Sequence, residues 1–148
     1  MRKLGSIVII DDDTEDLEIL SKALDSLKVV NKVLLFDCGS DFIKHVQANN
    51  DDFFFILCDI NMPTMNGFEL LGHIKADPVL AASCFPFILF STSWNIEDVK
   101  KAYSLPIQGY LKKPSSFKQI VKTLENVIAY WDSCFNTVSL DYGVSHSL

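Results

Sequence analysis

Five short runs rich in β-branched and aromatic residues recur along the chain, and a segment with helical spacing separates each run from the next. The runs are Ser6–Ile10, Lys32–Phe36, Phe53–Cys58, Phe87–Phe90 and Gly109–Leu111. Those in the middle are almost continuously apolar, which is typical of strands buried on both faces. This alternation of strand and helix is the feature that most limits the folds open to the chain.

The intervening segments carry apolar residues three and four positions apart, as amphipathic helices do. The clearest stripes lie within Leu17–Leu27 and Phe117–Trp131, and weaker ones lie within Asp41–Ala48, Phe68–Lys75 and Ile96–Tyr103. Capping and breaking residues mark the expected helix ends. We assign the first cap to Asp13 or Thr14, the start of the third helix to Asn66-Gly67, its end to Pro78, and the last cap to Ser115 or Ser116.

One crossover helix per step predicts a parallel sheet with helices on both faces, because neighbouring parallel strands need long right-handed connections. The predicted fold is α/β, doubly wound and flavodoxin-like, with a five-stranded parallel sheet in the order 2-1-3-4-5. We expect one domain over residues 4–131. Residues 132–148 are expected to be a C-terminal tail or extension with no output domain.

Composition narrows the classes of partner. The formal net charge is −6, which argues against nucleic-acid binding by this chain alone, because phosphate backbones are bound by clustered Lys and Arg. No apolar run approaches the roughly 20 residues that span a bilayer, and the apolar run before Asp11 is too short for a secretory signal. We therefore expect a cytoplasmic protein that does not bind membranes.

Polar residues follow the predicted strands, at the edge where such folds bind their ligands. Asp11-Asp12-Asp13 follow the first strand, Asp59 the third, Ser91-Thr92 the fourth and Lys113-Pro114 the fifth. Neighbouring carboxylates repel one another unless a divalent cation lies among them. Ligands that are all oxygen favour Mg²⁺.

Three of these side chains suit phosphoryl transfer, which depends mainly on positioning and charge neutralisation. Asp59 is the expected nucleophile, because it ends a buried strand on a loop. Lys113 is expected to pair with a carboxylate at rest and with the phosphoryl group afterwards, while Ser91 offers a hydroxyl to a phosphoryl oxygen.

Four segments of the chain share their pattern with one known family. They are I-I-D-D-D at Ile9–Asp13, I-L-C-D-I-N-M-P-T-M-N-G at Ile56–Gly67, F-S-T-S at Phe90–Ser93 and G-Y-L-K-K-P at Gly109–Pro114. In this order and spacing they closely resemble the CheY-like receiver domains of two-component response regulators. The resemblance covers residues 4–131, nearly the whole chain.

The resemblance implies a role for each matching residue. Asp59 would accept a phosphoryl group, and Asp11 and Asp12 would hold Mg²⁺ together with Asp59, with Asp12 as a direct ligand. The backbone carbonyl of Asn61 would also bind the ion. Lys113 would pair with the phosphoryl group.

The resemblance also implies a conformational response. Ser91 and Tyr110 would form a switch pair, in which the hydroxyl moves toward the phosphoryl group and the aromatic ring turns inward. The surface formed by Ile96–Tyr103, Gly109–Leu111 and Phe117–Trp131 would then change shape.

Three positions concern the detail of the match. The family pattern implies a cis peptide bond between Lys113 and Pro114. Thr92 stands where alanine is common in relatives, and it is expected to narrow access to the phosphoryl site or slow hydrolysis. Pro106 stands where many relatives have glycine after the fourth helix, which leaves the shape of that helix open.

The expected partners follow from the same resemblance. A histidine kinase or histidine phosphotransfer protein would supply the phosphoryl group, and a downstream protein target would read the phosphorylated state. The chain would act as a stand-alone phosphoacceptor that assists its own phosphorylation and dephosphorylation, and would not be an enzyme. We expect a monomer or a weak homodimer.

Two other functions fit part of the pattern. A phosphohydrolase of the haloacid-dehalogenase type would use Asp11 as nucleophile and Asp13 as acid and base, although Glu15 stands where its motif has Thr or Val and no acidic pair follows Lys113. A pseudo-receiver would keep the fold as an interaction module without the switch. The filled acceptor, metal, hydroxyl and lysine positions favour the working receiver.

Overall fold

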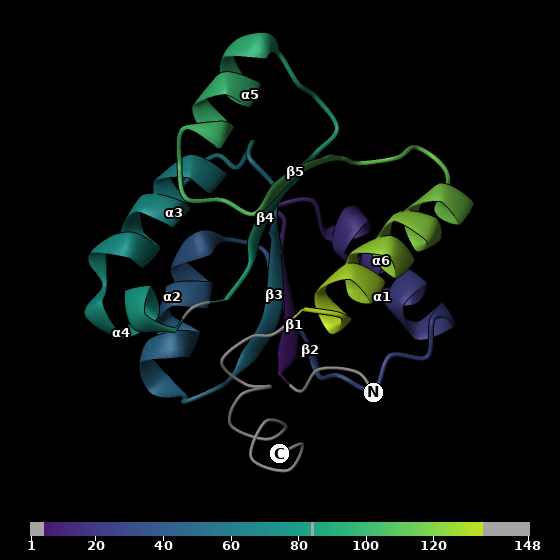
Figure 1. The fold of residues 1–148 in the computed structure, drawn as a ribbon, viewed down its shortest axis with the longest axis horizontal. Coiled ribbons are helices and arrows are strands. Elements are labelled where there is room, and N and C mark those ends of the chain that lie inside the picture. Colours follow the sequence, from purple (N-terminus) through teal and green to yellow (C-terminus); the bar gives the residue numbers. More distant parts are fainter. Residues whose placement is uncertain (1–4, 84, 135–148) are drawn as a thin grey trace.

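A computed structural model describes residues 5–83 and 85–134 and contains a five-stranded, all-parallel sheet. The strands are β1 (Ser6–Ile10), β2 (Val33–Phe36), β3 (Phe53–Cys58), β4 (Phe87–Ser91) and β5 (Gly109–Lys112). Their order is β2-β1-β3-β4-β5 (Figure 1), which confirms the predicted topology.

The helices connect successive strands, as predicted. They are α1 (Thr14–Ser26), α2 (Gly39–Ala48), α3 (Gly67–Ala76), α4 (Pro78–Ala82), α5 (Ile96–Tyr103) and α6 (Phe117–Asp132). Two of the weaker helix predictions were too short. Helix α2 begins at Gly39, before the predicted Asp41. Helix α3 runs over Gly67–Ala76 and extends beyond the predicted Phe68–Lys75 at both ends. The α5 range agrees with the prediction at both ends.

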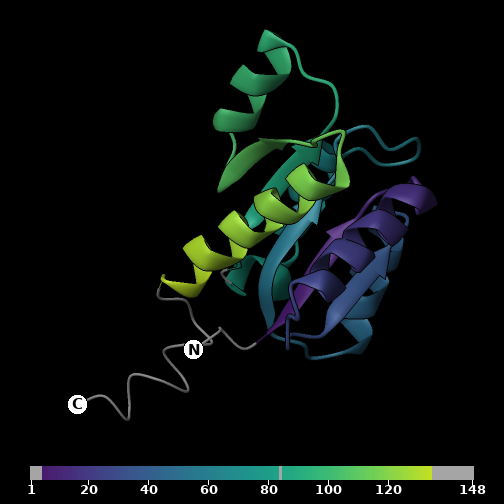
Figure 2. The ribbon, with the colours of Figure 1, turned by 90° about the vertical axis from the view of Figure 1, so that its right-hand side faces the viewer.

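Two hydrophobic cores lie on opposite faces of the sheet. On one face, Ile7 and Ile9 pack with α1 and α6; on the other, Val8 and Ile10 pack with α2, α3 and α4. Figures 1 and 2 show α1 beside α6 on one side of the sheet, with α5 at the end near β5. Because successive strand residues point to opposite faces, a strand covered on both sides is apolar throughout, which explains the continuous runs in the sequence.

Capping side chains mark the starts of helices α1 and α6. The Asp13 carboxylate accepts the backbone N–H groups of Glu15 (2.9 Å) and Asp16 (3.3 Å) at the start of α1. The Ser116 hydroxyl accepts the N–H of Gln119 (3.2 Å) at the start of α6. Of the two candidates predicted for each cap, the structure selects Asp13 and Ser116.

The prediction that Pro78 ends the third helix was incomplete. Helix α3 ends at Ala76, and Pro78 is the first residue of a further short helix, α4, which the sequence analysis did not predict. The Asp77 carboxylate caps α4 by accepting the N–H groups of Val79 (2.9 Å) and Leu80 (3.1 Å). Proline is tolerated there because the first helical N–H has no partner within the helix.

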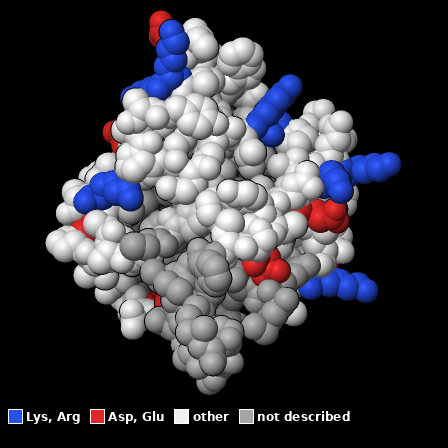
Figure 3. All heavy atoms as spheres, viewed as in Figure 1, with Lys and Arg blue, Asp and Glu red and all other residues white. Residues whose placement is uncertain are grey.

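The outer surface and the chain ends concern the predictions about partners and about the domain limits. Across the described ranges, no helix is both long enough and apolar enough to cross a bilayer. On the face drawn in Figure 3, the Lys and Arg side chains stand apart from one another. Residues 135–148, most of the predicted tail, lie outside the described residues, so the domain limits stay a prediction.

Candidate functional site

The ends of β1 and β3 bring two acidic residues together. Ile10 and Cys58 are opposite each other in the parallel register, so Asp11 and Asp59 follow at the same edge. The backbone N–H of Asp59 donates to the Ile10 carbonyl at 2.9 Å, which extends the pairing by one step beyond the strand. The sheet register therefore fixes where both carboxylates start.

Asp12 completes a cluster of three carboxylates, which we call the carboxylate cluster. One oxygen from each of Asp11, Asp12 and Asp59 lies within 4.8 Å of the others. Asp11 is buried, Asp59 is half-buried and Asp12 is exposed, so the cluster opens to solvent on one side. Carboxylate oxygens beside a solvent opening fit Mg²⁺, which combines a few carboxylates with retained waters.

The electrostatics of Asp59 also fit a cation. Burial raises the pKa of its carboxyl above 3.8, the nearby Lys113 charge lowers that pKa, and the Asp11 charge raises it again. The backbone N–H groups of Ile60 and Asn61 donate hydrogen bonds to the carboxylate, which also lowers the pKa of Asp59. The ionised carboxylate is thus held in place but incompletely neutralised.

Lys113 is 7% exposed and contacts Asp11, the buried member of the cluster. Its Nζ donates to Oδ2 of Asp11 at 2.6 Å and to Oδ2 of Asp16 at 3.0 Å. Burial acts to lower the pKa of Lys113, but its hydrogen bonds with Asp11 and Asp16, together with the nearby carboxylate charges, outweigh burial and raise it. Burial raises the pKa of the Asp11 carboxyl, although its hydrogen bond with Lys113 acts to lower that pKa. For the pair, the raised pKa of Lys113 is decisive, because two carboxylates bind its ammonium and keep it charged.

Asp16 is the site residue that the sequence analysis missed. It lies in the first turn of α1, and its side chain reaches the same ammonium as Asp11. A signal was present, because a carboxylate three residues after the cap at Asp13 lies over the start of the helix, close to the strand end. The pattern around Asp13 and Thr14 was interpreted only as a helix cap, and Asp16 was assigned no role.

Ser91 ends β4 and is 2% exposed. Within the described part of the chain, its hydroxyl oxygen has no hydrogen-bond partner. A buried polar atom without a partner is unfavourable unless a ligand or water completes it. Ser91 therefore has a free hydroxyl at the edge where Asp59 and Lys113 lie.

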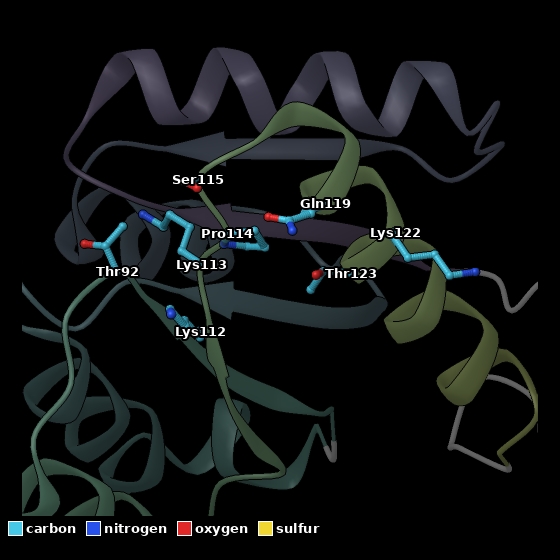
Figure 4. A pocket seen from close by; sticks show the side chains of 8 residues that line it. All are labelled: Thr92, Lys112, Lys113, Pro114, Ser115, Gln119, Lys122 and Thr123. Carbon is cyan, nitrogen blue, oxygen red and sulfur yellow. The ribbon is translucent and has the colours of Figure 1, made fainter.

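A cavity of about 560 Å³ adjoins Lys113 between the end of β5 and helix α6. Thr92 and Lys113 lie at one end of it and Lys122 at the other (Figure 4). Thr92 is exposed, so its methyl and hydroxyl groups line the approach to Lys113. Its effect on access and hydrolysis stays a prediction.

Tyr110 is half-buried on β5, and its hydroxyl donates weakly to the Ser93 carbonyl at 3.5 Å. The ring borders a cavity of about 170 Å³ together with Ser91 and Trp94. The side-chain amide of Asn61 donates to Oγ of Ser93 at 3.0 Å. The predicted switch pair, Ser91 and Tyr110, thus lines one cavity, and metal binding by the Asn61 carbonyl stays a prediction.

The loop after Asp59 turns back sharply on itself. The Gly67 N–H donates to the Ile60 carbonyl at 2.9 Å, and a Cβ on Gly67 would lie 2.7 Å from the carbonyl oxygen of Asp59. Asn66 and Glu69 form a capping box at the start of α3. Gly67 therefore helps position the acceptor loop, beyond the turn that the sequence predicted.

The comparisons with known proteins agree with this geometry. Residues 7–125 match the response regulator receiver domain family. The chain belongs to the response regulator receiver family.

Similar proteins cover most of this receiver. The probable methanogenesis regulatory protein FilR2 of Methanothrix harundinacea is 26% identical over 84% of this chain and 82% of its own. The response regulator Rcp1 of Synechocystis is 25% identical over 84% of this chain and 87% of its own. The solved structure of the phosphorylated cyanobacterial phytochrome response regulator RcpA has a TM-score of 0.77 and 26% identity, covering 89% of this chain and 96% of its own.

One feature implied by the family pattern is wrong for this receiver. The described residues contain no cis peptide bond, so the bond between Lys113 and Pro114 is trans. The trans isomer is the intrinsically favoured one by about 0.5–1 kcal/mol. With this bond trans, Lys113 still reaches Asp11 at 2.6 Å.

The phosphohydrolase alternative gains no support. The receiver match covers the residues that this alternative would use. Its supposed acid and base, Asp13, has one carboxylate oxygen committed to two backbone N–H groups of α1, and its supposed nucleophile, Asp11, is bonded to Lys113. The receiver arrangement, in contrast, leaves Asp59 without an ion-pair partner among the described residues.

Proposed function

We propose that this receiver accepts a phosphoryl group on Asp59 from a phosphohistidine in a Mg²⁺-dependent reaction. The donor would be a histidine kinase or a histidine phosphotransfer protein. The observation that carries the proposal is the carboxylate cluster of Asp11, Asp12 and Asp59, with Lys113 bonded to its buried member and a free Ser91 hydroxyl at the same edge. This combination supplies a nucleophile, neutralising charge and a hydroxyl donor.

The residues of this chain account for the transfer step. An Asp59 carboxylate oxygen forms a bond to phosphorus while the bond from phosphorus to the donor imidazole nitrogen breaks. The imidazole leaves with the electron pair and takes up a proton from solvent. Lys113 and the Ser91 hydroxyl then donate to phosphoryl oxygens, which lowers the free energy of the charged product.

Asp11, Asp12, Asp59 and the Asn61 carbonyl are the residues that would hold Mg²⁺. The bound ion supplies charge neutralisation for the acceptor and the incoming phosphoryl oxygens. A solved form of Rcp1, which is 24% identical to this chain with a TM-score of 0.74, holds Mn²⁺. That relative and the oxygen-only cluster support a divalent cation at this edge.

The response would pass through Tyr110 to the surface formed by α5, β5 and α6, where a downstream protein target binds. These elements correspond to the fourth helix, fifth strand and fifth helix of the sequence prediction, because α4 is an additional helix. The free Ser91 hydroxyl and the half-buried Tyr110 ring line one cavity, which supports their coupling. On this proposal the chain is a cytoplasmic phosphoacceptor and a monomer or weak homodimer; it is not an enzyme that turns over a substrate.

Phosphotransfer tests the proposal directly. The full chain is incubated with acetyl phosphate or candidate histidine kinases, with and without Mg²⁺, and the modified residue is located by mass spectrometry. We expect label on Asp59 only when Mg²⁺ is present, none in Asp59→Asn, and normal label in Asp52→Asn, which removes an exposed carboxylate at the other end of β3. Label on Asp11, or none under any condition, would contradict the proposal.

A further inference from the structure

We propose that Asp16 is a positioning residue that holds the Lys113 ammonium against α1 in the unphosphorylated protein and competes with a phosphoryl group for it. The inference rests on the proposed phosphorylation of Asp59 and adds a resting-state contact to it. On this inference Lys113 gives up its bond to Asp16, at least in part, when it binds the phosphorylated acceptor.

Two carboxylates already bind the Lys113 ammonium. An ammonium has three N–H donors, and two of them are taken by Asp11 at 2.6 Å and Asp16 at 3.0 Å. Among the described residues, no ion pair within 4.0 Å joins Lys113 to Asp59. At rest the ammonium is therefore bonded to the carboxylate that follows β1 and to one on α1, and not to the acceptor.

Asp16 is anchored at the start of α1 and is partly exposed to solvent. Its N–H is fixed by the Asp13 cap at 3.3 Å, so the backbone under this carboxylate is anchored at the helix start. Asp16 is outside the carboxylate cluster, and its side chain is 30% exposed while that of Lys113 is 6% exposed. A partly solvated carboxylate bonds a buried ammonium strongly enough to hold it and weakly enough to release it.

Phosphorylation changes the balance of charge at the acceptor. The phosphoryl oxygens carry about two negative charges in place of the single charge of the Asp59 carboxylate, so the acceptor gains about one negative charge. The ammonium is expected to gain more there than it loses at a single carboxylate. The bond to Asp16 opposes that transfer. Removing the Asp16 charge is expected to strengthen binding of a phosphoryl mimic.

The test measures beryllofluoride binding to the full chain with Mg²⁺ by calorimetry. Asp16→Asn is expected to bind about fivefold more tightly than the wild type, the scale of one partly exposed charged hydrogen bond. Glu15→Gln is the matched control, because it removes the same charge from the same turn where the side chain is exposed. It is expected to change affinity by less than about twofold, because exposed charges are screened.

A double-mutant cycle separates the contact from general electrostatics. If Asp16 acts through Lys113, Asp16→Asn should have no effect on beryllofluoride affinity in a Lys113→Met background. A second readout follows the side-chain ammonium signal of Lys113 in nitrogen-detected nuclear magnetic resonance, and in the wild type this signal should shift on beryllofluoride binding. Asp16→Asn should shift the same signal without beryllofluoride, whereas Glu15→Gln should not.

The outcomes distinguish this inference from the proposed function. Unchanged or weaker binding in Asp16→Asn, an equal effect of Glu15→Gln, or an effect that persists in the Lys113→Met background would overturn the role of Asp16. Failure of the wild type to bind beryllofluoride, or equal binding by Asp59→Asn, would instead overturn the phosphoacceptor proposal. If Asp16→Asn does not fold, the Lys113 signal of the wild type still decides, because an unmoved ammonium signal contradicts its release.

Discussion

On the α1 side of the carboxylate cluster, Lys113 is buried and bonded to two carboxylates, whereas on the α5 side the buried Ser91 hydroxyl has no partner within the described residues and Trp94 is 63% exposed. The packing differs in the same way. Helices α1 and α6 share a continuous core, while Ala102 is the only fully buried residue of α5. The difference fits the proposed function, in which the α1 side holds the charges for phosphoryl transfer and the α5 side changes shape.

Core truncation on the two sides should give the largest contrast. Leu124 on α6 is fully buried in the core shared with α1, so Leu124→Ala should lower the free energy of unfolding by about 3 kcal/mol. Val99 on α5 is only half-buried, and Val99→Ala should lower it by less than about 1 kcal/mol. Urea unfolding monitored by circular dichroism measures both; similar losses would remove the distinction between the two sides.

The charge of Asp59 should have an intermediate effect, visible without divalent cations. Because burial raises the pKa of Asp59 in the folded protein above 3.8, its ionisation opposes folding. Asp59→Asn should therefore stabilise the protein at neutral pH by on the order of 1 kcal/mol, after allowance for solvent screening.

The pH dependence of this effect has a defined sign. The advantage of Asp59→Asn should be small near pH 3.8 and grow as pH rises through the folded-state pKa, where the wild-type carboxyl becomes charged. Thermal unfolding in chelator across this range checks it, with Asp52→Asn as the exposed control. An advantage that shrinks toward neutral pH would show that Lys113 outweighs burial at Asp59.

The smallest effect is expected at Tyr110. Its hydroxyl makes one long bond, 3.5 Å to the Ser93 carbonyl, so Tyr110→Phe should change the free energy of unfolding by no more than about 0.5 kcal/mol. Urea unfolding of the two proteins measures it. A loss several times larger would mean that Tyr110 is held as firmly as Lys113, and the contrast between the α1 side and the α5 side would be lost.

The helices α4 and α5 show which parts of the fold could be predicted from the sequence and which could not. Periodicity predicted the α5 range at both ends, because apolar spacing records which faces are buried. The sheet order was predicted from the flavodoxin-like fold that the alternation of strands and helices indicates. Periodicity did not predict α4, where Asp77 and Pro78 start a new helix. A proline that ends one helix and begins the next has the same local signature in both roles.

The sequence by itself determined which groups stand at the strand ends, namely Asp11, Asp59, Ser91 and Lys113, because the strand pattern and the residue after each strand are local properties. Only the tertiary structure decided how the charges pair. Lys113 bonds to Asp11 and Asp16, residues 102 and 97 positions away, and makes no ion pair with Asp59 in the described part of the chain. The choice among these nearby carboxylates depends on the register of the sheet and on the position of α1, which no local pattern encodes.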